Sequence, residues 1–314
     1  MFNTKRWTEL LECTYGYPTT INYGTTHKLF LSDVQSEFGH YIVAPAFGDY
    51  ISFTQEQFSD LAKFALSMPD LPMRIKVWSD VIPKIDQFAV EPSGYIHQLA
   101  FSSFDDWNKN QIKCKFRNQI KQGARAGLRT VISKERKDII SFWEMHAELR
   151  VSKFKEIPQP KIFFVNLHKA YIQENHGFTL CAFDTNSNLI AGIVVLLDGD
   201  TAYYKFAASN QAALHLRPNN FLIAELISYL EKIGINKLNF GYTGATSKYN
   251  GLRKYKLATG AREYSRFILK KKSHLLADIS PIAEINRKVA CLLNQSPSLD
   301  EIDAFSEEHY RSFV

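Results

Sequence analysis

The order of strands and helices in the second half of the chain restricts its fold more than any other feature. Short apolar runs alternate with longer amphipathic segments, and tight polar turns such as Asp184–Asn188 and Asp198–Asp200 separate some of the apolar runs. These turns predict three successive antiparallel strands. In chain order the predicted elements are a strand at 128–132, helices at 137–150 and 161–175, strands at 178–183, 189–197 and 201–208, a helix at 219–233, a strand at 237–242, a short basic helix and a strand at 262–271.

The first half of the chain predicts a similar mixture. At 314 residues and 45% hydrophobic composition, the chain is long enough for two domains, each with its own core. Predicted strands lie at 28–31, 41–44, 73–78 and 95–101, with helices at 55–68 and 105–126. We therefore predict an α/β (α+β) fold with mixed, mostly antiparallel sheets flanked by helices, divided into domains at 1–126 and 127–272 and a helical appendage at 273–314.

Positive charge is concentrated between residues 107 and 134. This stretch has eight basic and no acidic residues, although the formal net charge of the whole chain is only +6. On a continuous helix, five of the bases would form one stripe at i, i+4 spacing, namely Lys109, Lys113, Arg117, Lys121 and Arg125. A stripe of like charges favours an anionic partner such as a diphosphate, a tRNA backbone or a lipid head group. We predict that Arg117 and Lys121 bind substrate; a solvated face paired with distant acids is the alternative.

The segment 239–260 is a second candidate for binding an anion. A strand ends just beyond Gly241, a polar loop follows, and a short helix carries several bases. Leu252 and Tyr255 are three residues apart and are expected to face the core, so that Arg253 and Lys256 would share the opposite, polar face. A solvated basic helix is equally consistent with this pattern.

Cysteine spacing and hydropathy exclude several classes of protein. Cys13, Cys114, Cys181 and Cys291 are too widely separated for a zinc or redox motif, and no metal site is predicted. The chain has no apolar run long enough to span a membrane and no secretion signal at its start. We expect a cytoplasmic protein whose basic stretch can contact a membrane surface; the sequence does not predict its oligomeric state.

Several blocks of sequence, taken in order, resemble the FemAB-like acyltransferases. They extend over about residues 105–269 and are Lys115–Leu128, Phe142–Arg150, Pro158–Phe164, Leu189–Gly192, Asp200–Tyr204, Leu216–Leu222 and Asn239–Gly241 followed by Lys256 and Gly260. The resemblance implies two tandem GNAT-like domains, the first of them degenerate. Relatives in this family move amino acids from aminoacyl-tRNA onto peptidoglycan precursors or use acyl-CoA. It thus implies a donor substrate, acyl-CoA or aminoacyl-tRNA, and no tightly bound cofactor.

The resemblance also assigns roles to individual residues. Lys256 matches the family's lysine near the developing oxyanion, and we predict that it is catalytic together with Tyr242, which lies at the strand end. Arg150 matches an arginine that precedes a mobile loop, where a substrate contact and a favourable position at the helix C-terminus are both plausible. We further predict that Tyr204 and Arg253 bind substrate, although a core position for one of the two neighbouring tyrosines is expected.

The start of the helix at 219–233 bears on the donor. Arg217, Asn219 and Asn220 stand where a typical CoA-dependent GNAT protein has a glycine-rich loop for pyrophosphate, and we predict that they bind the donor. Between residues 200 and 233 there is no glycine, which predicts weak acetyl-CoA binding. Asn239 stands where many relatives have aspartate, which removes a possible general base.

The sequence therefore predicts an N-acyltransferase that moves an acyl or aminoacyl group onto an amine of an anionic cell-envelope glycan, peptide or lipid-linked precursor. One alternative is an acetyl-CoA-dependent GNAT N-acetyltransferase of an amino sugar or small amine. The alternative of another class is a non-catalytic protein that binds polyanions, either nucleic acid or a membrane surface.

Overall fold

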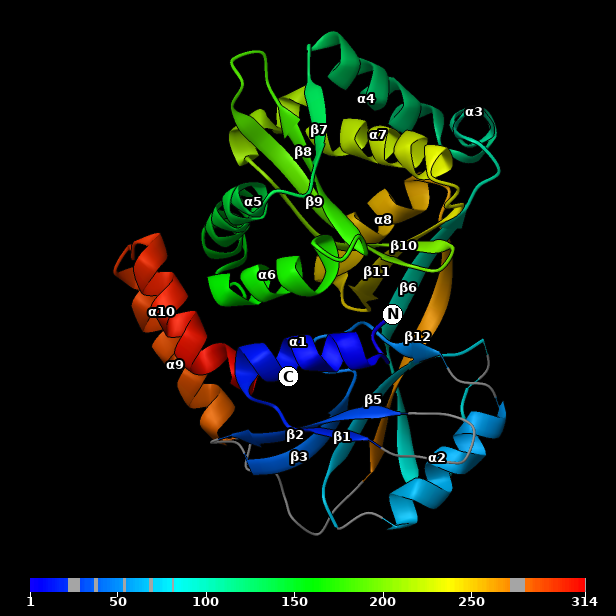
Figure 1. Ribbon diagram of the computed structural model, residues 1–314, viewed down its shortest axis with the longest axis vertical. Helices are drawn as coiled ribbons and strands as arrows, with labels where there is room; N and C mark the ends of the chain where they lie inside the picture. The colour runs from blue at the N-terminus through cyan, green and yellow to red at the C-terminus, as the bar shows by residue number, and fades with distance from the viewer. Residues whose placement is uncertain are drawn as a thin grey trace.

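The described residues form one large mixed sheet flanked by helices (Figure 1). The computed structural model describes residues 1–21, 29–36, 39–52, 55–67, 70–80, 82–271 and 280–313. Its strands are β1 (Thr19–Ile21), β2 (Phe30–Ser36), β3 (Gly39–Ala44), β4 (Ile51–Ser52), β5 (Met73–Trp78), β6 (Phe88–Ala100), β7 (Arg129–Ser133), β8 (Gly177–Phe183), β9 (Leu189–Asp198), β10 (Thr201–Ser209), β11 (Lys237–Gly244) and β12 (Arg262–Lys271).

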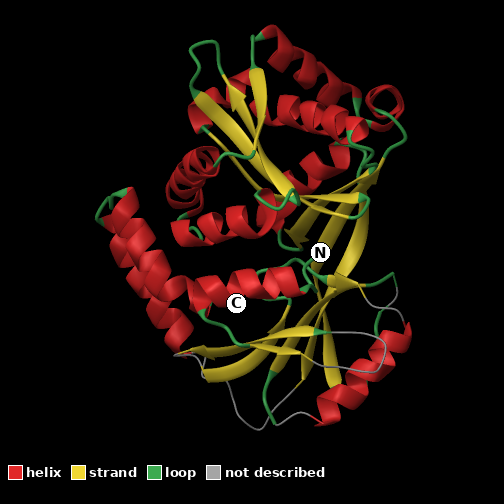
Figure 2. Ribbon diagram, in the orientation of Figure 1, coloured by secondary structure: helices red, strands yellow, loops and turns green. Residues whose placement is uncertain are grey.

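The helices lie on both faces of this sheet and at one end of the molecule (Figure 2). They are α1 (Lys5–Tyr15), α2 (Gln55–Ser67), α3 (Phe104–Asp106), α4 (Cys114–Arg125), α5 (Arg136–Leu149), α6 (Lys161–Leu167), α7 (Pro218–Lys232), α8 (Asn250–Ala258), α9 (Ser280–Asn294) and α10 (Leu299–His309). Every described helix is too short or too polar to cross a lipid bilayer.

The order of strands in the sheet is β1-β2-β3-β5-β12-β6-β11-β10-β9-β8-β7, and β4 pairs with β5 beside this path. The three predicted hairpin strands β8, β9 and β10 are antiparallel neighbours, as expected from their short turns. The long strand β6 lies between β11 and β12 and is antiparallel to both. Strand β12 in turn pairs with β5, so the sheet continues from one half of the chain into the other.

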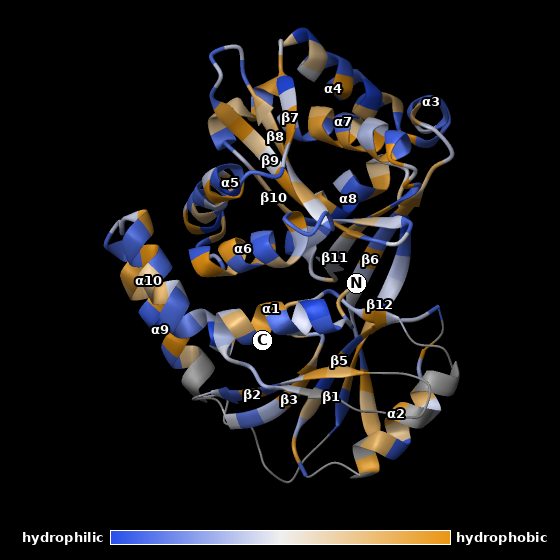
Figure 3. Ribbon diagram, in the orientation of Figure 1, coloured by the Kyte–Doolittle hydropathy of each residue, from blue (hydrophilic) through white to orange (hydrophobic). Residues whose placement is uncertain are grey.

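Two hydrophobic cores cover opposite faces of strands β8 to β10. On one face α7 packs against the strands with Leu222, Ile223 and Leu226 fully buried, and α4 packs along the outside of α7. On the other face α5 and α6 bury Phe142, Trp143 and similar side chains together with part of α1. Figure 3 shows apolar colour concentrated on β8 to β10 and α7, whereas α4 carries much hydrophilic colour.

The predicted helix at 105–126 is wrong as a single helix. The α3 turn and the following turn at Trp107–Gln111 end at Ile112, which is extended (φ −85°, ψ 149°), and α4 begins only at Cys114. Tertiary contacts produce this break, because Ile112 is buried and the N–H of Lys113 donates to the carbonyl of Ala258 (3.3 Å). The basic stripe is shortened accordingly, since Lys109 lies before the break and Lys113 caps the new helix.

The strand predicted at 95–101 is β6, which begins seven residues earlier at Phe88, and other boundaries differ by a few residues. The predicted helix at 161–175 is α6 continued by a wider turn at His168–Ile172. Residue 28, the predicted start of a strand, and residue 68, the predicted end of a helix, lie outside the described residues. So do residues 272–279, which include the predicted boundary between the second domain and the appendage. The division at residue 126 stays a prediction.

Candidate active site

The candidate active site lies where β10 and β11 separate. These parallel strands pair from Thr201 to Tyr203 on β10 and from Lys237 to Asn239 on β11, and the pairing ends there. Past this point β11 bulges at Gly241, whose φ is +68° and whose N–H donates to Oδ1 of Asn239 (2.8 Å). Because a bulge interrupts the ladder, the backbone groups of β11 at this point become available to other partners.

A loop from the first half of the chain, residues 45–50, lies against this split. Its carbonyls accept hydrogen bonds from side chains of three strands: Pro45 O from Lys76 Nζ (3.3 Å), Phe47 O from Lys205 Nζ (2.9 Å), and Asp49 O from Arg266 Nε (2.5 Å). The hydroxyl of Tyr50 accepts from Nδ2 of Asn239 (2.7 Å). The loop therefore contacts both β10 and β11 at the point where they diverge.

Gly241 allows the loop to come this close. A Cβ at Gly241 would lie 2.8 Å from Oδ2 of Asp49, and the positive φ disfavours other residues in any case. The carboxylate of Asp49 is thereby held directly beside the backbone of β11.

Four cationic side chains surround this carboxylate: Lys76 on β5, Lys205 on β10, Lys256 on α8 and Arg266 on β12. Burial lowers the pKa of each, and the charge of Asp49 acts against that lowering in all four cases. Among the described residues, Asp49 is the only acid that acts on all of them. The split is therefore strongly electropositive.

Lys76 is the most perturbed lysine of the group. Burial, together with the charges of Arg266 and Lys205, lowers its pKa to about 7. Burial lowers the pKa of Lys256 less, to about 8. At neutral pH Lys76 is thus divided between its two protonation states and can accept or donate a proton.

A cavity of about 180 Å³ opens beside the cluster. Tyr50 and Tyr203 line it, their side chains hydrogen-bonded to one another, together with Ser52 and the first residues of the chain. It is large enough for a small polar group, and the two hydroxyls can donate or accept hydrogen bonds there.

Lys256 lies on the opposite side of its helix from the one we expected. It is buried (4% exposed), and its Nζ donates to the carbonyls of Gly241 (3.2 Å) and Tyr242 (2.9 Å), whereas Leu252 is exposed. The bulge explains this orientation, because its two carbonyls need a donor and Lys256 supplies it. Tyr255 does face the core, where its ring contacts Phe116.

A chain of polar side chains continues beneath Lys256. Arg253 donates two hydrogen bonds of 2.6 Å to the carboxylate of Glu263. Glu263 also contacts Nε2 of the fully buried His97 (3.1 Å), whose Nδ1 faces the hydroxyl of Thr243 (3.4 Å). Burial, reinforced by Lys256, lowers the pKa of His97 to about 4, so this histidine is neutral at pH 7. Arg253 is thus engaged by a protein carboxylate.

The two predicted tyrosines lie close to the split. The hydroxyl of Tyr242 donates to the carbonyl of Ser93 (2.7 Å), and its ring lies 4.4 Å from the guanidinium of Arg266. Tyr204 packs against Phe240 within the core, where burial raises its pKa. Tyr242 therefore borders the cationic cluster, and Tyr204 belongs to the apolar side of the split.

The basic residues of α4 lie away from the cluster. Arg117 donates to the carbonyls of Asn108 (2.5 Å), Lys109 (2.7 Å) and Ile112 (3.4 Å), and so closes the turn before α4. Lys121 is exposed. A substrate contact for either residue stays a prediction, but the guanidinium of Arg117 already has backbone partners.

The start of α7 holds the predicted donor-binding residues. Arg217 is in the left-handed region (φ 61°) and donates to Gln122 on α4 (3.2 Å). The side chain of Asn219 donates to Ser209 (3.2 Å), and that of the buried Asn220 donates to Gln119 (3.3 Å). All three side chains therefore have protein partners, and their role in donor binding stays a prediction.

Sequence reasoning missed four members of the cluster: Asp49, Lys76, Lys205 and Arg266. A signal was present for two of them, since Lys76 and Lys205 lie among apolar and aromatic residues in the strands MRIKVW and TAYYKFAAS. A lysine in a half-buried strand position is costly and therefore informative. Asp49 carried no comparable signal, because it lies in a loop.

Comparison with known proteins identifies part of the chain. Residues 112–264 match the family described as the acetyltransferase (GNAT) domain. The chain carries a GNAT domain. The parallel pair β10 and β11, which separates at the cationic cluster, lies within the matched residues. This segment, just under half of the chain, is accordingly of the GNAT acyltransferase type.

Solved structures extend the similarity of fold to both halves of this GNAT protein. FemX superimposes with a TM-score of 0.66 at 12% identity, over 85% of this chain and 91% of FemX. The C-terminal domain of a putative lysylphosphatidylglycerol synthetase from Agrobacterium fabrum gives 0.60 at 10% identity, over 92% of this chain and 96% of that domain. The L-PGS structure from Bacillus licheniformis gives 0.57 at 11% identity, over 89% and 94%.

These likenesses confirm the predicted FemAB-like GNAT fold, and at such identities they concern the fold alone. Among curated protein sequences, none matches the chain significantly.

Proposed function

We propose that this GNAT protein transfers an acyl or aminoacyl group to an amine of an anionic cell-envelope precursor, at the split between β10 and β11. The observation that carries the proposal is the excess of positive charge there, four cations around the single carboxylate of Asp49. Buried charges that lack a countercharge cost several kcal/mol each, even when carbonyl groups hydrogen-bond them. A phosphate or carboxylate of the substrate would supply the missing negative charge.

The names of the fold relatives support the substrate class. One is FemX, and another is a synthetase whose name describes a lysyl group attached to phosphatidylglycerol, an anionic lipid. An aminoacyl donor also suits the start of α7, where Arg217 takes the left-handed conformation and no glycine-rich loop is present. We therefore favour an aminoacyl donor over acetyl-CoA.

The residues at the split can assist each step of such a transfer. The acceptor ammonium must first lose a proton, and Lys76, with its pKa lowered to about 7, is a suitable proton acceptor. The amine nitrogen then attacks the carbonyl carbon of the donor ester or thioester, and negative charge develops on the carbonyl oxygen. As the new C–N bond forms, the nitrogen becomes positively charged and releases its second proton to solvent. The bond to the leaving oxygen or sulfur then breaks, and the proton held by Lys76 passes to that leaving atom.

Lys256 is placed to stabilise charge in this reaction. A protonated lysine has three N–H donors, and the carbonyls of Gly241 and Tyr242 use two of them. The third is available for a substrate oxygen at the end of β11. A cation fixed by two backbone groups needs little reorganisation as the oxyanion forms, which is the condition for effective electrostatic catalysis.

A transfer assay tests this function. The purified protein would be incubated with one donor, either acetyl-CoA, a longer acyl-CoA or aminoacyl-tRNA, and with amine-bearing lipid, glycan and peptide acceptors. Products would be identified by mass spectrometry. We expect one donor and acceptor pair to give product, and Lys205→Met to reduce the rate by about two orders of magnitude, as loss of a preorganised charge does. Lys254→Met, an exposed lysine on α8, is the matched control.

Two outcomes would contradict the proposal. Unchanged turnover in both Lys205→Met and Arg266→Met would remove the cluster from the reaction. Tight binding of unrelated RNA, with no product from any donor, would favour the non-catalytic polyanion-binding alternative.

A further inference from the structure

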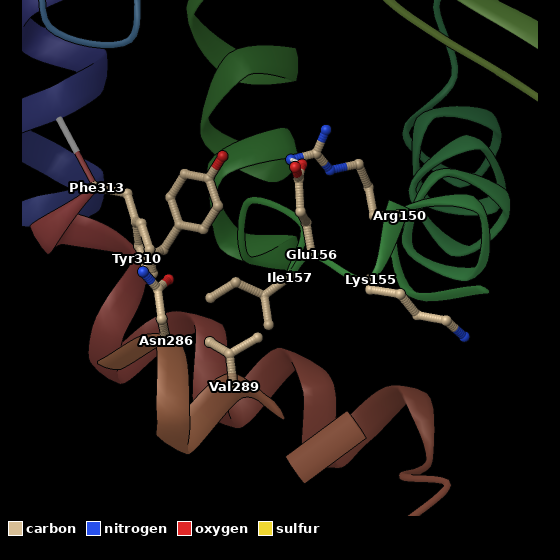
Figure 4. Close-up of a pocket in the computed structure, with 8 residues that line it drawn as sticks. All are labelled: Arg150, Lys155, Glu156, Ile157, Asn286, Val289, Tyr310 and Phe313. Atoms are coloured by element: carbon tan, nitrogen blue, oxygen red, sulfur yellow. Dashed lines mark ion pairs between the residues drawn. The ribbon is translucent and has the colours of Figure 1, made fainter. Parts of the chain in front are cut away.

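A second cavity lies between the C-terminal helices and the turn that follows α5. Its volume is about 360 Å³, at the lower end of the range for small-molecule sites. One wall is formed by Arg150, Glu156 and Ile157, and the other by Asn286 and Val289 of α9 with residues that follow α10 (Figure 4). The GNAT match ends at residue 264. The second wall of the cavity is therefore formed by residues that lie beyond the matched segment, in α9 and after α10.

One side of the cavity is apolar. Ile157 and Val289 are buried in a small hydrophobic cluster of their own, together with Ile285. Phe313 adds an aromatic ring that is 39% exposed. Such a surface favours a hydrocarbon or aromatic group, since burying it removes apolar area from water.

The other side presents polar side chains with hydrogen-bond donors. Arg150 meets Glu156 through Nη2 (2.5 Å), but its Nε is buried and has no partner. In the part of the chain that the structure describes, the hydroxyl of the half-buried Tyr310 has no hydrogen-bond partner, and the amide of Asn286 is exposed to solvent. In Figure 4 the hydroxyl of Tyr310 points toward the side on which Arg150 and Glu156 meet. The guanidinium of Arg150, the hydroxyl of Tyr310 and the amide of Asn286 give this side of the cavity donors that can hydrogen-bond a polar ligand group.

The charge balance around the cavity favours an anion. Glu156 is already shared by two cations, Arg150 and Lys248 (3.5 Å). Lys155 adds a further positive charge at the rim, although its side chain extends away from the centre in Figure 4. A guanidinium binds carboxylate and phosphate oxygens through paired N–H groups, and Arg150 retains free donors for this.

We propose that this cavity binds an amphiphilic oxyanion, a phosphate or carboxylate that carries an apolar tail. The oxyanion lies against Arg150, Tyr310 and Asn286, and the tail covers Ile157 and Val289. The ligand is a free small molecule or the head group of a lipid, which have the same chemistry. Binding here requires no transfer reaction, so it can hold even if the proposed function fails.

Calorimetry with the full-length protein and octyl phosphate, used below its micelle concentration, tests the site. We expect a Kd below about 1 mM, with binding at least about tenfold weaker for octanol and for inorganic phosphate, each of which lacks one half of the ligand. Val289→Phe fills the apolar side and Arg150→Lys removes the planar donor, and each should weaken binding by about tenfold or more. Lys153→Gln, an exposed charge in the same turn that does not line the cavity, is the matched control and should bind normally.

Sedimentation with vesicles separates the two sources of the ligand. If the site takes a lipid head group, the wild type should bind phosphatidylglycerol vesicles and Val289→Phe should not. If the site takes a free molecule, the wild type should bind octyl phosphate but not the vesicles. Asn286→Leu, a milder change on the outer wall, covers the case in which Val289→Phe does not fold. Equal affinity for octyl phosphate in wild type, Arg150→Lys and Asn286→Leu would overturn the proposal, as would equal affinity for octanol.

Discussion

Replacing Lys76 by methionine should make the protein more stable while it impairs activity. Lys76 lies on β5 between the buried residues Ile75 and Val77, and its ammonium donates one long hydrogen bond, to Pro45 O (3.3 Å). Methionine has a similar length and no charge, so it can occupy the same space with little rearrangement. The substitution removes a charge that the fold tolerates poorly.

The size of the effect follows from the pKa. Lys76 has a pKa of about 7 in the folded protein against an ordinary lysine value of 10.5, and each pKa unit corresponds to 1.36 kcal/mol. At pH 7 the shift therefore costs the folded state about 4 kcal/mol relative to an unperturbed lysine. Loss of the hydrogen bond to Pro45 returns about 1 kcal/mol of that. The expected net gain is about 3 kcal/mol.

The pH dependence gives the sign of the effect. The folded-state pKa lies below the unfolded value, so the unfolded chain binds more protons between about pH 7 and pH 10.5. The penalty in the wild type is fully present below about pH 7 and disappears as the pH rises through this window. The stability advantage of Lys76→Met should shrink over the same range.

Urea denaturation of both proteins at pH 6, 7 and 10 measures this difference. Ionisation of tyrosines at high pH affects both proteins equally and cancels in the comparison. Lys254→Met, at an exposed position, should show neither the gain nor its pH dependence. A destabilised Lys76→Met at pH 7, or a gain that stays constant up to pH 10, would refute the electrostatic account of the cluster.

Three further predictions concern the site. Lys256→Ala should lower turnover by roughly two orders of magnitude and leave the far-UV circular dichroism unchanged, and wild-type turnover would exclude an oxyanion role. Lys121→Ala should weaken binding of an anionic substrate more at low than at high salt in a titration, whereas Arg117→Ala should mainly lower the melting temperature because its backbone hydrogen bonds are lost. Calorimetry should detect weak or no binding of acetyl-CoA, and low-micromolar affinity unaffected by Arg217→Ala would contradict the proposed donor.

Local patterns in the sequence were sufficient for most of the second half. Strands β8 to β10 were predicted because short polar turns separate apolar runs, and both features are local in the chain. The start of α7 and the strand before α8 followed from the same kind of signal. The GNAT order of elements could therefore be recognised before any contact was known.

Contacts between distant residues account for what was missed. The break at Ile112 depends on Ala258, and the burial of Lys256 depends on the bulge at Gly241. The hydrogen bond between Arg266 and Asp49 joins residues 217 positions apart. Nothing in the periodicity of a single helix or strand encodes such a pairing, and so the central cluster became visible only in three dimensions.

The position of β6 has a consequence for any attempt to cut this protein in two. Strand β6, from the first half of the chain, pairs with β11 and β12 of the second half. Strand β12, from the second half, pairs with β5 of the first half, so each half contributes a strand to the part of the sheet formed by the other. A fragment that starts at residue 127 would leave β11 with a bare edge, which invites intermolecular pairing and aggregation. The two halves are interlocked in the manner of an intramolecular strand exchange, and we expect them to unfold together and to resist separate expression.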